Sequence, residues 1–486
     1  MTSQKLYLDY DLWARLIAGM GVIEGHHVLK TDFLSYTPTH VWYDHEYGSG
    51  VIFYCFLKYL GSYSLIVLQA LLLLGVVYFL IKTIQKRGIS SPYNLLYWFI
   101  FICIFMNKTC IPIRCQLFSY LCFTLFIYLL ENIRQGKYKL SFLLPIITIL
   151  WNNLHGGVVS GLGLIFLYFV GEITNKKLRK YLLTTLFVST ICLVINPWGI
   201  KFISFLIYAN TMERPDVVEW LGLFSKIHML NHIPFKIFMM SIISLEIFVI
   251  HKIFKANKSL KMTPVNIDKT KYLVLLVTLY LAISHVKLIP FFIISGTAFC
   301  YEDFAKYLET KIPKFINCFC AVIIFLICTT GFVYIINKHV PLGKIIYPHR
   351  EVEFIKINNI KGNILSNFGY GSFIAYKLYP QNKIYMDGRY EEVYNENLET
   401  TMKNFYLLKD NWDEILTKYP TDIILLDNMY NNVYEKMQTQ QDWIKVYDTK
   451  IFSVFIRKEL KKEEYIQPTE DVRYYKNTLF DTSVKF

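Results

Sequence analysis

The N-terminal stretch 9–50 gathers side chains that can move protons or hold a metal ion. Its acids and imidazoles include Asp9, Asp11, Asp32, Asp44, Glu46, His26, His27, His40 and His45. Two carboxylates one residue apart, as in Asp9 and Asp11, can hold Mg²⁺ or Mn²⁺, and one of them can take a proton from an acceptor hydroxyl. The alternative is that one carboxylate only caps the helix that starts here. Hydrophobic segments follow directly, which indicates chemistry at a membrane surface.

A second acidic group lies in WYDHEYG, where His45 separates Asp44 from Glu46. On a strand both carboxylates would face the same side, whereas in a loop they would be ordinary solvated turn residues. TDFLSYT adds Asp32 between the two groups. Because one short head holds both acidic groups, a site that includes Asp11, Asp44 and Glu46 is favoured over isolated structural roles.

Later polar residues lie at the ends of apolar runs, where charge is costly and tends to be functional. Arg114 comes just before the run that begins at Gln116, and Lys287 lies within SHVKLIP. Such cations suit the phosphate of a lipid carrier, although both side chains could instead reach out to the lipid headgroups. WNNLHGG adds Asn153 and His155. This motif could bind a phosphate or orient an acid, and the alternative is a polar helix cap.

The composition indicates a protein that crosses a membrane many times. Hydrophobic residues make up 54% and charged residues 18% of the 486 positions, whereas soluble domains carry about 25% charged residues. The net charge of +14 could suggest nucleic acid, but Lys and Arg cluster in short loops between apolar runs, which is typical of cytoplasmic anchoring. We therefore exclude nucleic-acid binding. About ten spans are predicted, at 62–81, 93–106, 116–130, 140–152, 158–173, 181–196, 236–251, 272–285, 288–300 and 317–337.

The alternation of basic and less basic loops sets the expected orientation. The loops that follow the first, third, fifth, seventh and ninth runs are rich in Lys and Arg and are predicted to be cytoplasmic. An even number of spans then puts the head and the C-terminal region on the outer face. The outer loops include 211–220, which could be a lid over a substrate or a plain connection.

The sequence predicts four regions, namely an outer interfacial head over 1–60, a transmembrane domain over 61–337, a small extracytoplasmic α/β domain over 338–460 and a charged tail over 461–486. In the head, an apolar stripe after Asp11 predicts a helix, which could lie in the membrane interface with Trp13 at headgroup level. The α/β domain is expected to hold a mixed sheet, with strands at 362–368, 383–388, 422–427, 444–448 and 452–456. Turns are expected at GYGSF (369–373) and DGRY (387–390), the second with an Asp387–Arg389 interaction.

The order of these motifs resembles a large group of bacterial membrane proteins that are similar to the GT-C superfamily of polyprenyl-phosphate-sugar-dependent glycosyltransferases. That superfamily includes the protein mannosyltransferases and oligosaccharyltransferases. The resemblance covers nearly the whole chain and rests on DYDLWARLIAG, TDFLSYT, WYDHEYG, IRCQLFSYL, WNNLHGG, NPWG, VVEW, NFGYGSFIAYKLYP and YMDGRYEEVY. It implies a sugar donor on a lipid phosphate and a first outer loop with catalytic acids, which map to Asp9, Asp11, Asp44 and Glu46. It also implies a transmembrane helix before the DYD motif, where this sequence has eight residues.

These observations lead to one expected activity. The chain is expected to be a multi-pass glycosyltransferase of the bacterial inner membrane, with its C-terminal domain outside. It would transfer a sugar from a polyprenyl phosphate or diphosphate to a glycan, lipid or protein of the envelope. The expected catalytic residues are Asp11, Asp44 and Glu46, the expected ligands of Mg²⁺ or Mn²⁺ are Asp9 and Asp11, and the expected substrate-binding residues are Arg114, His155, Asn153, Lys287, Asp32 and His45. The alternatives are a transport or polymer-handling protein and a non-catalytic assembly protein of envelope polysaccharide synthesis.

Overall fold

The computed structural model describes residues 9–105, 112–214, 217–258, 267–336, 347–394 and 396–486, and most of these residues are helical. Contacts divide the chain into two compact units. Unit 1 combines Met1–Leu65 with His339–Phe486, and unit 2 is Ile66–Lys338. The head and the C-terminal region, which the sequence analysis treats as separate regions, therefore belong to one unit.

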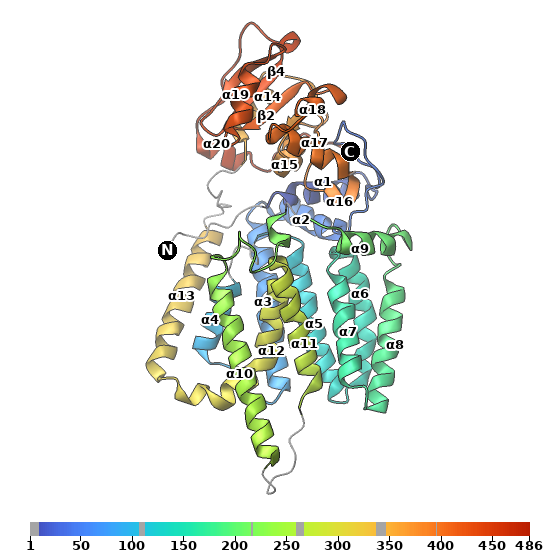
Figure 1. Ribbon diagram of the computed structural model, residues 1–486, viewed down its shortest axis with the longest axis vertical. Coiled ribbons are helices and arrows are strands. Elements are labelled where there is room, and N and C mark those ends of the chain that lie inside the picture. The colour runs from blue at the N-terminus through green and yellow to red at the C-terminus, as the bar shows by residue number, and fades with distance from the viewer. Residues whose placement is uncertain (1–8, 106–111, 215–216, 259–266, 337–346, 395) are drawn as a thin grey trace. The chain divides into compact units, whose positions relative to one another are not determined.

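Unit 2 is a helical bundle, with α9 lying across one end (Figure 1). Its helices are α3 (Ser64–Lys86), α4 (Leu95–Phe105), α5 (Gln116–Arg134), α6 (Leu143–Leu154), α7 (Val158–Gly171), α8 (Lys176–Cys192), α9 (Lys201–Thr211), α10 (Ile233–Lys258), α11 (Lys269–Ser284), α12 (Ile289–Tyr307) and α13 (Lys314–Ile336). Each predicted apolar run lies mostly within one of these helices. Among the described residues, the segments long and apolar enough to cross a membrane are Ser64–Lys86, Gln116–Arg134, Ile233–Lys255 and Val286–Tyr307. The remaining spans of the predicted ten stay a prediction.

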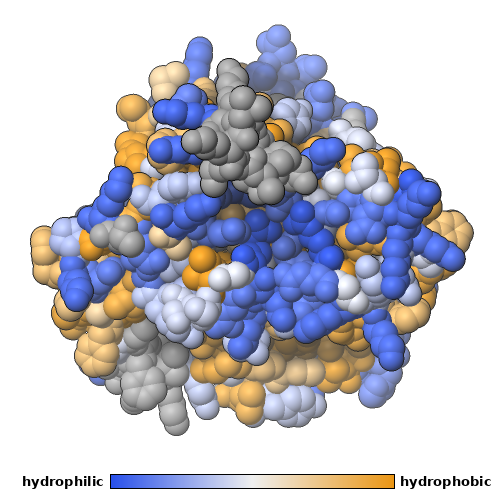
Figure 2. All heavy atoms as spheres, turned by 90° about the horizontal axis from the view of Figure 1, so that it is seen from below, coloured by the Kyte–Doolittle hydropathy of each residue, from blue (hydrophilic) through white to orange (hydrophobic). Residues whose placement is uncertain are grey.

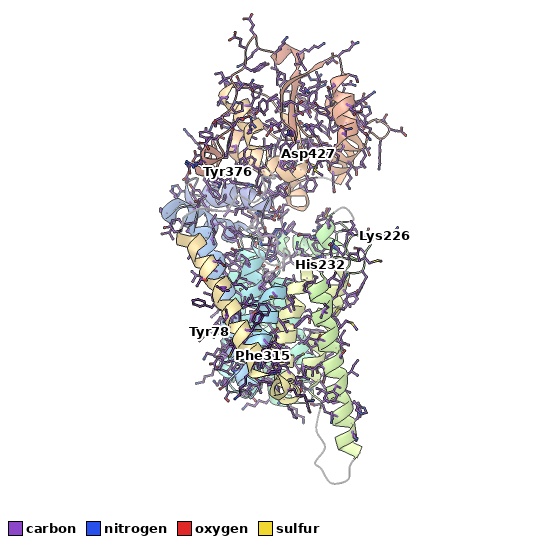
Figure 3. The ribbon with its side chains drawn as sticks, turned by 90° about the vertical axis from the view of Figure 1, so that its left-hand side faces the viewer. Tyr78, Lys226, His232, Phe315, Tyr376 and Asp427 are labelled. Atoms are coloured by element: carbon purple, nitrogen blue, oxygen red, sulfur yellow. The ribbon has the colours of Figure 1, made fainter. Side chains whose placement is uncertain are left out.

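Apolar side chains face outward on several helices of this bundle. Tyr78 on α3 is 55% exposed and Phe315 at the start of α13 is 72% exposed (Figure 3). Leu74 and Phe187 are exposed to a similar degree, at 64% and 66%. Helices that are apolar on their outer as well as their inner faces are typical of a bundle surrounded by lipid.

Charged side chains tie the helices together at one end of unit 2. Arg87, just after α3, lies 3.1 Å from a carboxylate oxygen of Glu131 on α5 and 3.3 Å from one of Asp268, just before α11. Arg134 lies 2.8 Å from Asp268 and 2.6 Å from Glu172, just after α7. Hydrophilic residues fill the middle of this end and apolar residues surround them (Figure 2). This network fixes α5 and α11, whose other ends carry residues of the site described below.

Unit 1 combines two helices of the head with a small α/β fold. Its helices are α1 (Asp11–Ile23), α2 (Tyr47–Leu60), α14 (His349–Ile357), α15 (Phe368–Leu378), α16 (Tyr390–Val393), α17 (Glu396–Tyr406), α18 (Glu414–Lys418), α19 (Asn431–Gln438) and α20 (Val472–Asn477). Strands β1 (Ile364–Ser366), β2 (Ile423–Asp427), β3 (Trp443–Asp448) and β4 (Phe452–Arg457) form one sheet in the order β1-β2-β4-β3. β1 is parallel to β2, and β4 is antiparallel to β2 and β3. The predicted mixed sheet is therefore confirmed, and its apolar strand β2 is buried throughout.

Two local predictions in this unit are wrong. Residues 369–373 lie in helix α15 and form no turn, because Asn367 caps the helix by accepting a backbone N–H of its first turn (3.1 Å). A Cβ on Gly371 would overlap the carbonyl oxygen of Met386, so this glycine allows close packing of the helix. Residues 383–388 make only isolated bridges and no strand of the sheet.

Helix α1 is buried inside unit 1, so the predicted interfacial position of its apolar stripe is wrong. The Trp13 side chain is fully buried, and its ring centroid lies 5.1 Å from that of Phe373 and 5.5 Å from that of Phe480. Because Phe480 belongs to the predicted tail, the tail packs onto the domain core. Helices α1 and α2 approach closely at Gly19 and Gly50, where a Cβ would overlap a carbonyl oxygen of the other helix.

Candidate functional sites

Three connecting segments at one end of unit 2 bring Arg114, Glu219 and Lys287 together, and we call this group the cationic site. Arg114 Nη1 lies 2.6 Å from one carboxylate oxygen of Glu219, and Lys287 Nζ lies 3.8 Å from the other. Burial would raise the pKa of Glu219, but Arg114 and then Lys287 outweigh it and lower the pKa to about 2. The three side chains remain 22–27% exposed. They line a small pocket together with Gln116 and Tyr120.

The indole ring of Trp220 supports the cationic site. The guanidinium carbon of Arg214 lies 4.3 Å from the ring centroid and Lys287 Nζ lies 4.7 Å from it, both within the range of a cation–π interaction. Arg214 also donates to two carbonyl groups at the C-terminal end of α9 (2.7 and 3.2 Å), where cations are favourable. Arg214 therefore has a structural role, and Arg114 and Lys287 are the cations that a ligand can reach.

Hydrogen bonds join the end of the 211–220 loop and the residues after it to the α11–α12 connection. His285 Nδ1 lies 2.6 Å from the Trp220 carbonyl oxygen. The N–H of Leu223 donates to the Ile283 carbonyl (2.9 Å), and the N–H of Val286 donates to the Leu221 carbonyl (3.1 Å). A role of the loop as a lid stays a prediction. Positions 215 and 216 of the loop lie outside the described residues.

His155 has a defined hydrogen-bonding pattern. Its Nδ1 accepts the Gly157 N–H (3.0 Å) and lies 2.6 Å from Ser119 Oγ, which in turn accepts from Trp151 Nε1 (2.7 Å). Because a backbone N–H can only donate, neutral His155 carries its proton on Nε2. Asn153 donates to two backbone carbonyl groups (2.8 and 2.9 Å) and links α6 to the segment after α8.

In unit 1, the second acidic group of the head surrounds Arg15 of α1. The Arg15 guanidinium contacts Asp44 through Nη1, lies 3.0 Å from Glu392 through Nη2 and lies 3.5 Å from Glu46 through Nε. The side chains of Arg15, Asp44 and Glu392 are at most 4% exposed. The sequence analysis missed Arg15 and Glu392. A charge inside the apolar stripe of α1 is the signal that could have revealed Arg15.

His45 lies beside two of the same carboxylates. Its Nδ1 lies 3.1 Å from Glu392 Oε1, and its Nε2 lies 3.7 Å from Glu46 Oε1. Burial raises the pKa of Asp44 to about 6, an effect that Arg15 only partly offsets. Burial also opposes ionisation of Glu392, but Arg15 and His45 outweigh it and lower the pKa of Glu392 to about 2. We call Asp44, His45, Glu46 and Glu392 the carboxylate cluster.

Asp32 pairs with a buried arginine. Arg389 Nη1 lies 2.8 Å from Asp32, and Arg389 Nε lies 2.9 Å from Asp387. All three side chains are at most 1% exposed, and the guanidinium lies 4.6 Å from the centroid of the Trp42 ring. Burial would raise the pKa of Asp32, but Arg389 lowers it. The predicted Asp387–Arg389 interaction is confirmed, and a substrate-binding role of Asp32 stays a prediction.

Asp9 and Asp11 lie at the start of α1. Asp9 Oδ1 accepts the backbone N–H of Asp11 (3.1 Å), as a capping carboxylate does. Asp11 lies against the turn of the DGR motif, since a Cβ on Gly388 would be 2.8 Å from its Oδ1. Two carboxylates suit Mg²⁺ or Mn²⁺, but within the described residues no third His, Cys, Asp or Glu completes a ligand set with them. A metal ion at this pair stays a prediction.

The structure divides the predicted site residues between the two units. Unit 1 holds Asp9, Asp11, Asp32, Asp44, His45 and Glu46, and unit 2 holds Arg114, Asn153, His155 and Lys287. No protein-family model matches the chain, and no curated protein matches it.

Proposed function

We propose that the protein is a membrane glycosyltransferase that takes a sugar from a polyprenyl phosphate or diphosphate and passes it to an envelope acceptor at the outer face of the inner membrane. The observation that carries this proposal is the cationic site of unit 2. There, Arg114 and Lys287 meet beside the ends of apolar helices that are long enough to cross a membrane. A lipid-linked phosphate needs both features, namely cations for its oxygens and apolar helices beside its chain.

Glu219 occupies the position that the donor phosphate would take. Its carboxylate holds two cations together that would otherwise repel each other. A phosphate group offers more oxygens and more negative charge than a carboxylate, and the planar fork of Arg114 matches its geometry. A lipid phosphate would therefore compete with Glu219 for both cations.

In the proposed reaction, the oxygen of the acceptor hydroxyl attacks the anomeric carbon of the donor sugar. A carboxylate base takes the hydroxyl proton, the bond from the anomeric carbon to the phosphate oxygen breaks, and the polyprenyl phosphate leaves with the bonding electrons. Arg114 and Lys287 stabilise the negative charge that develops on this phosphate, and the Nε2–H of His155 is a further donor. In unit 1, Asp11 stays the predicted base and, with Asp9, a predicted ligand of Mg²⁺ or Mn²⁺, because these ions prefer carboxylate oxygens.

Binding of a polyprenyl phosphate to the detergent-solubilised full chain tests the cationic site. Arg114→Gln and Lys287→Gln should each weaken binding roughly 10- to 100-fold, because a hydrogen bond to a charged group contributes about 1.5–3 kcal/mol. Glu219→Gln should strengthen binding, since it removes the competing carboxylate. Lys226→Gln is the matched control, because Lys226 is exposed and projects outward from the segment before α10 (Figure 3).

Two results would refute the role of the cationic site. One is equal affinity in the wild type and in all four variants. The other is weaker binding after Glu219→Gln, which would mean that the carboxylate holds the cations in a structural role and does not compete with the ligand.

A non-catalytic or polymer-handling role in polysaccharide assembly is favoured by one observation. Asp44 and Glu46, two of the predicted catalytic acids, are bound to Arg15 in a buried cluster, and Asp32 is bound to Arg389. Carboxylates that pair with a buried arginine have a structural role. A protein of this second class would bind polyprenyl phosphate without releasing it from a sugar, so a sugar-release assay separates the two functions.

A further inference from the structure

The carboxylate cluster of unit 1 holds more negative charge than its buried position favours. Asp44, Glu46 and Glu392 surround one guanidinium, that of Arg15. With all three carboxylates ionised and His45 neutral, the cluster has an excess of two negative charges. The three acids are only 1–9% exposed, and charges buried to this degree are normally paired or bound to a metal ion. A divalent cation supplies the missing charge.

Each of the two glutamates has one carboxylate oxygen beside His45. In Glu392, Arg15 Nη2 donates to both oxygens, Oε2 (3.0 Å) and Oε1 (3.2 Å), and Oε1 also lies 3.1 Å from His45 Nδ1. In Glu46, Oε2 lies 3.5 Å from Arg15 and Oε1 lies 3.7 Å from His45 Nε2. Arg15 thus holds both carboxylates in place, and one oxygen of each lies close to the imidazole.

We propose that His45, Glu46 and Glu392 bind a transition-metal dication of the Zn²⁺ or Mn²⁺ type. One ligand atom from each residue lies within 4.8 Å of the others. Ligand atoms around a tetrahedral Zn²⁺ are about 3.3 Å apart, so small rotations of the side chains complete the set. Imidazole nitrogens and carboxylate oxygens are both ligands of Zn²⁺, and open Zn²⁺ sites combine three protein ligands with a water in the fourth position. The imidazole disfavours Mg²⁺ and Ca²⁺, which prefer oxygen ligands.

Asp44 gives an independent indication of a ligand in this cluster. Its Oδ1 contacts Arg15 and accepts the backbone N–H of Glu46 (2.9 Å). Its Oδ2 is buried and accepts no hydrogen bond from any residue that the structure describes, although Asp44 as a whole is 1% exposed. A buried carboxylate oxygen without a donor is costly. Asp44 and both glutamates contact the same guanidinium, that of Arg15, so the proposal assigns a water bound to the metal ion as the donor to Oδ2.

The proposed ion would join distant parts of the chain. His45 and Glu46 belong to the head, whereas Glu392 lies on α16 of the C-terminal region. A metal ion bound only in the folded state stabilises that state in proportion to its affinity and concentration. A bound ion would therefore stabilise unit 1, and this effect does not depend on the proposed transferase activity.

Metal binding by the full chain in detergent tests this site. After treatment with EDTA, the wild type should take up one equivalent of Zn²⁺, measured as metal content by mass spectrometry. Co²⁺ as a probe should give visible absorption bands, and Zn²⁺ should raise the melting temperature. His45→Gln should lower the Zn²⁺ affinity at least about tenfold and remove the Co²⁺ bands, because it deletes the nitrogen ligand.

Two further variants keep this test decisive. His40→Gln removes an exposed imidazole of the same head and should bind Zn²⁺ like the wild type. Glu46→Gln removes a carboxylate ligand with little change in shape, so it tests the site again should His45→Gln fail to fold. No stoichiometric uptake by the wild type, or unchanged uptake by both His45→Gln and Glu46→Gln, would overturn the proposal.

Discussion

The substitution Arg389→Met removes the cation that lies between two buried carboxylates of unit 1. The side chains of Asp32 and Asp387 are 0% exposed, so neither can be hydrated unless the structure opens. Methionine keeps much of the apolar volume beside Trp42, and the substitution therefore reports mainly on charge. Removing one partner of a buried ion pair costs about 3–5 kcal/mol. We expect the substitution to lower the free energy of opening of this region by the same amount.

Hydrogen–deuterium exchange of the full chain in detergent measures this loss within unit 1. The N–H groups of Ile384 and Tyr385 donate to the carbonyl groups of Leu34 and Ile364 and should report on opening of this region. A loss of about 3–5 kcal/mol in the free energy of opening corresponds to roughly 100- to 4,000-fold faster exchange of such amides.

The effect of Arg389→Met should depend on pH. In the wild type, burial opposes ionisation of Asp32, but Arg389 lowers its pKa below the usual value. Ionised Asp32 therefore stabilises the fold at neutral pH and loses its contribution as the pH falls below about 4. In the variant the guanidinium is gone, so burial shifts the pKa of Asp32 upward from its wild-type value. The variant should be least stable at neutral pH and recover as Asp32 takes up a proton, so the difference from the wild type should shrink as the pH falls below neutral.

Arg350→Met is the matched control for this experiment. Arg350 pairs with Glu470 at 2.7 Å, but their side chains are 37% and 83% exposed. Exposed pairs of this kind contribute about 0–1 kcal/mol, so exchange should change by less than about fivefold. Equally fast exchange in both Arg→Met variants, or a defect of Arg389→Met that is independent of pH, would refute the reasoning.

Three other substitutions in unit 1, with one control substitution in unit 2, are tested by thermal unfolding. Burial raises the pKa of Glu351 to about 7, although its hydrogen bond to Thr449 opposes this. The wild type is fully stable below about pH 4.5, where Glu351 is neutral, and loses stability as the pH rises through 7 and the buried carboxyl ionises. Glutamine stays neutral, so Glu351→Gln should be more stable than the wild type at pH 8 by up to about 3 kcal/mol. Gly50→Ala should cost at least about 2 kcal/mol, because its Cβ would overlap the backbone of α1, whereas Gly163→Ala, with no atom within 4 Å, should be neutral or stabilising. Trp13→Ala should cost about 3–5 kcal/mol, since its indole is fully buried.

Local patterns account for the parts of the fold that could be predicted from the sequence. Long apolar runs mark the helices of unit 2, and the apolar stretch 422–427 marks strand β2 as buried. The interaction of Asp387 with Arg389 also follows from local spacing, because the two residues flank one glycine in a turn. Each of these features depends on residues close together in the chain.

The remaining features depend on pairing between distant parts of the chain. Arg15 binds Glu392, and Arg389 binds Asp32, but no spacing in the sequence relates these residues. The same cause explains the incorrect placement of α1, because an apolar stripe can face lipid or a protein core. The stripe is buried here by aromatic residues such as Phe373, which come from the opposite end of the sequence.

Release of polyprenyl phosphate from a sugar-bearing donor tests the transferase proposal most directly. The full chain in liposomes would receive a panel of polyprenyl phosphate sugars, with and without an envelope extract as the source of acceptor. We predict acceptor-dependent release from at least one donor, with loss of release in Arg114→Gln and Asp11→Asn and retention in Lys226→Gln. Equal release by Arg114→Gln and the wild type would contradict the proposal, as would binding of polyprenyl phosphate without release from any donor.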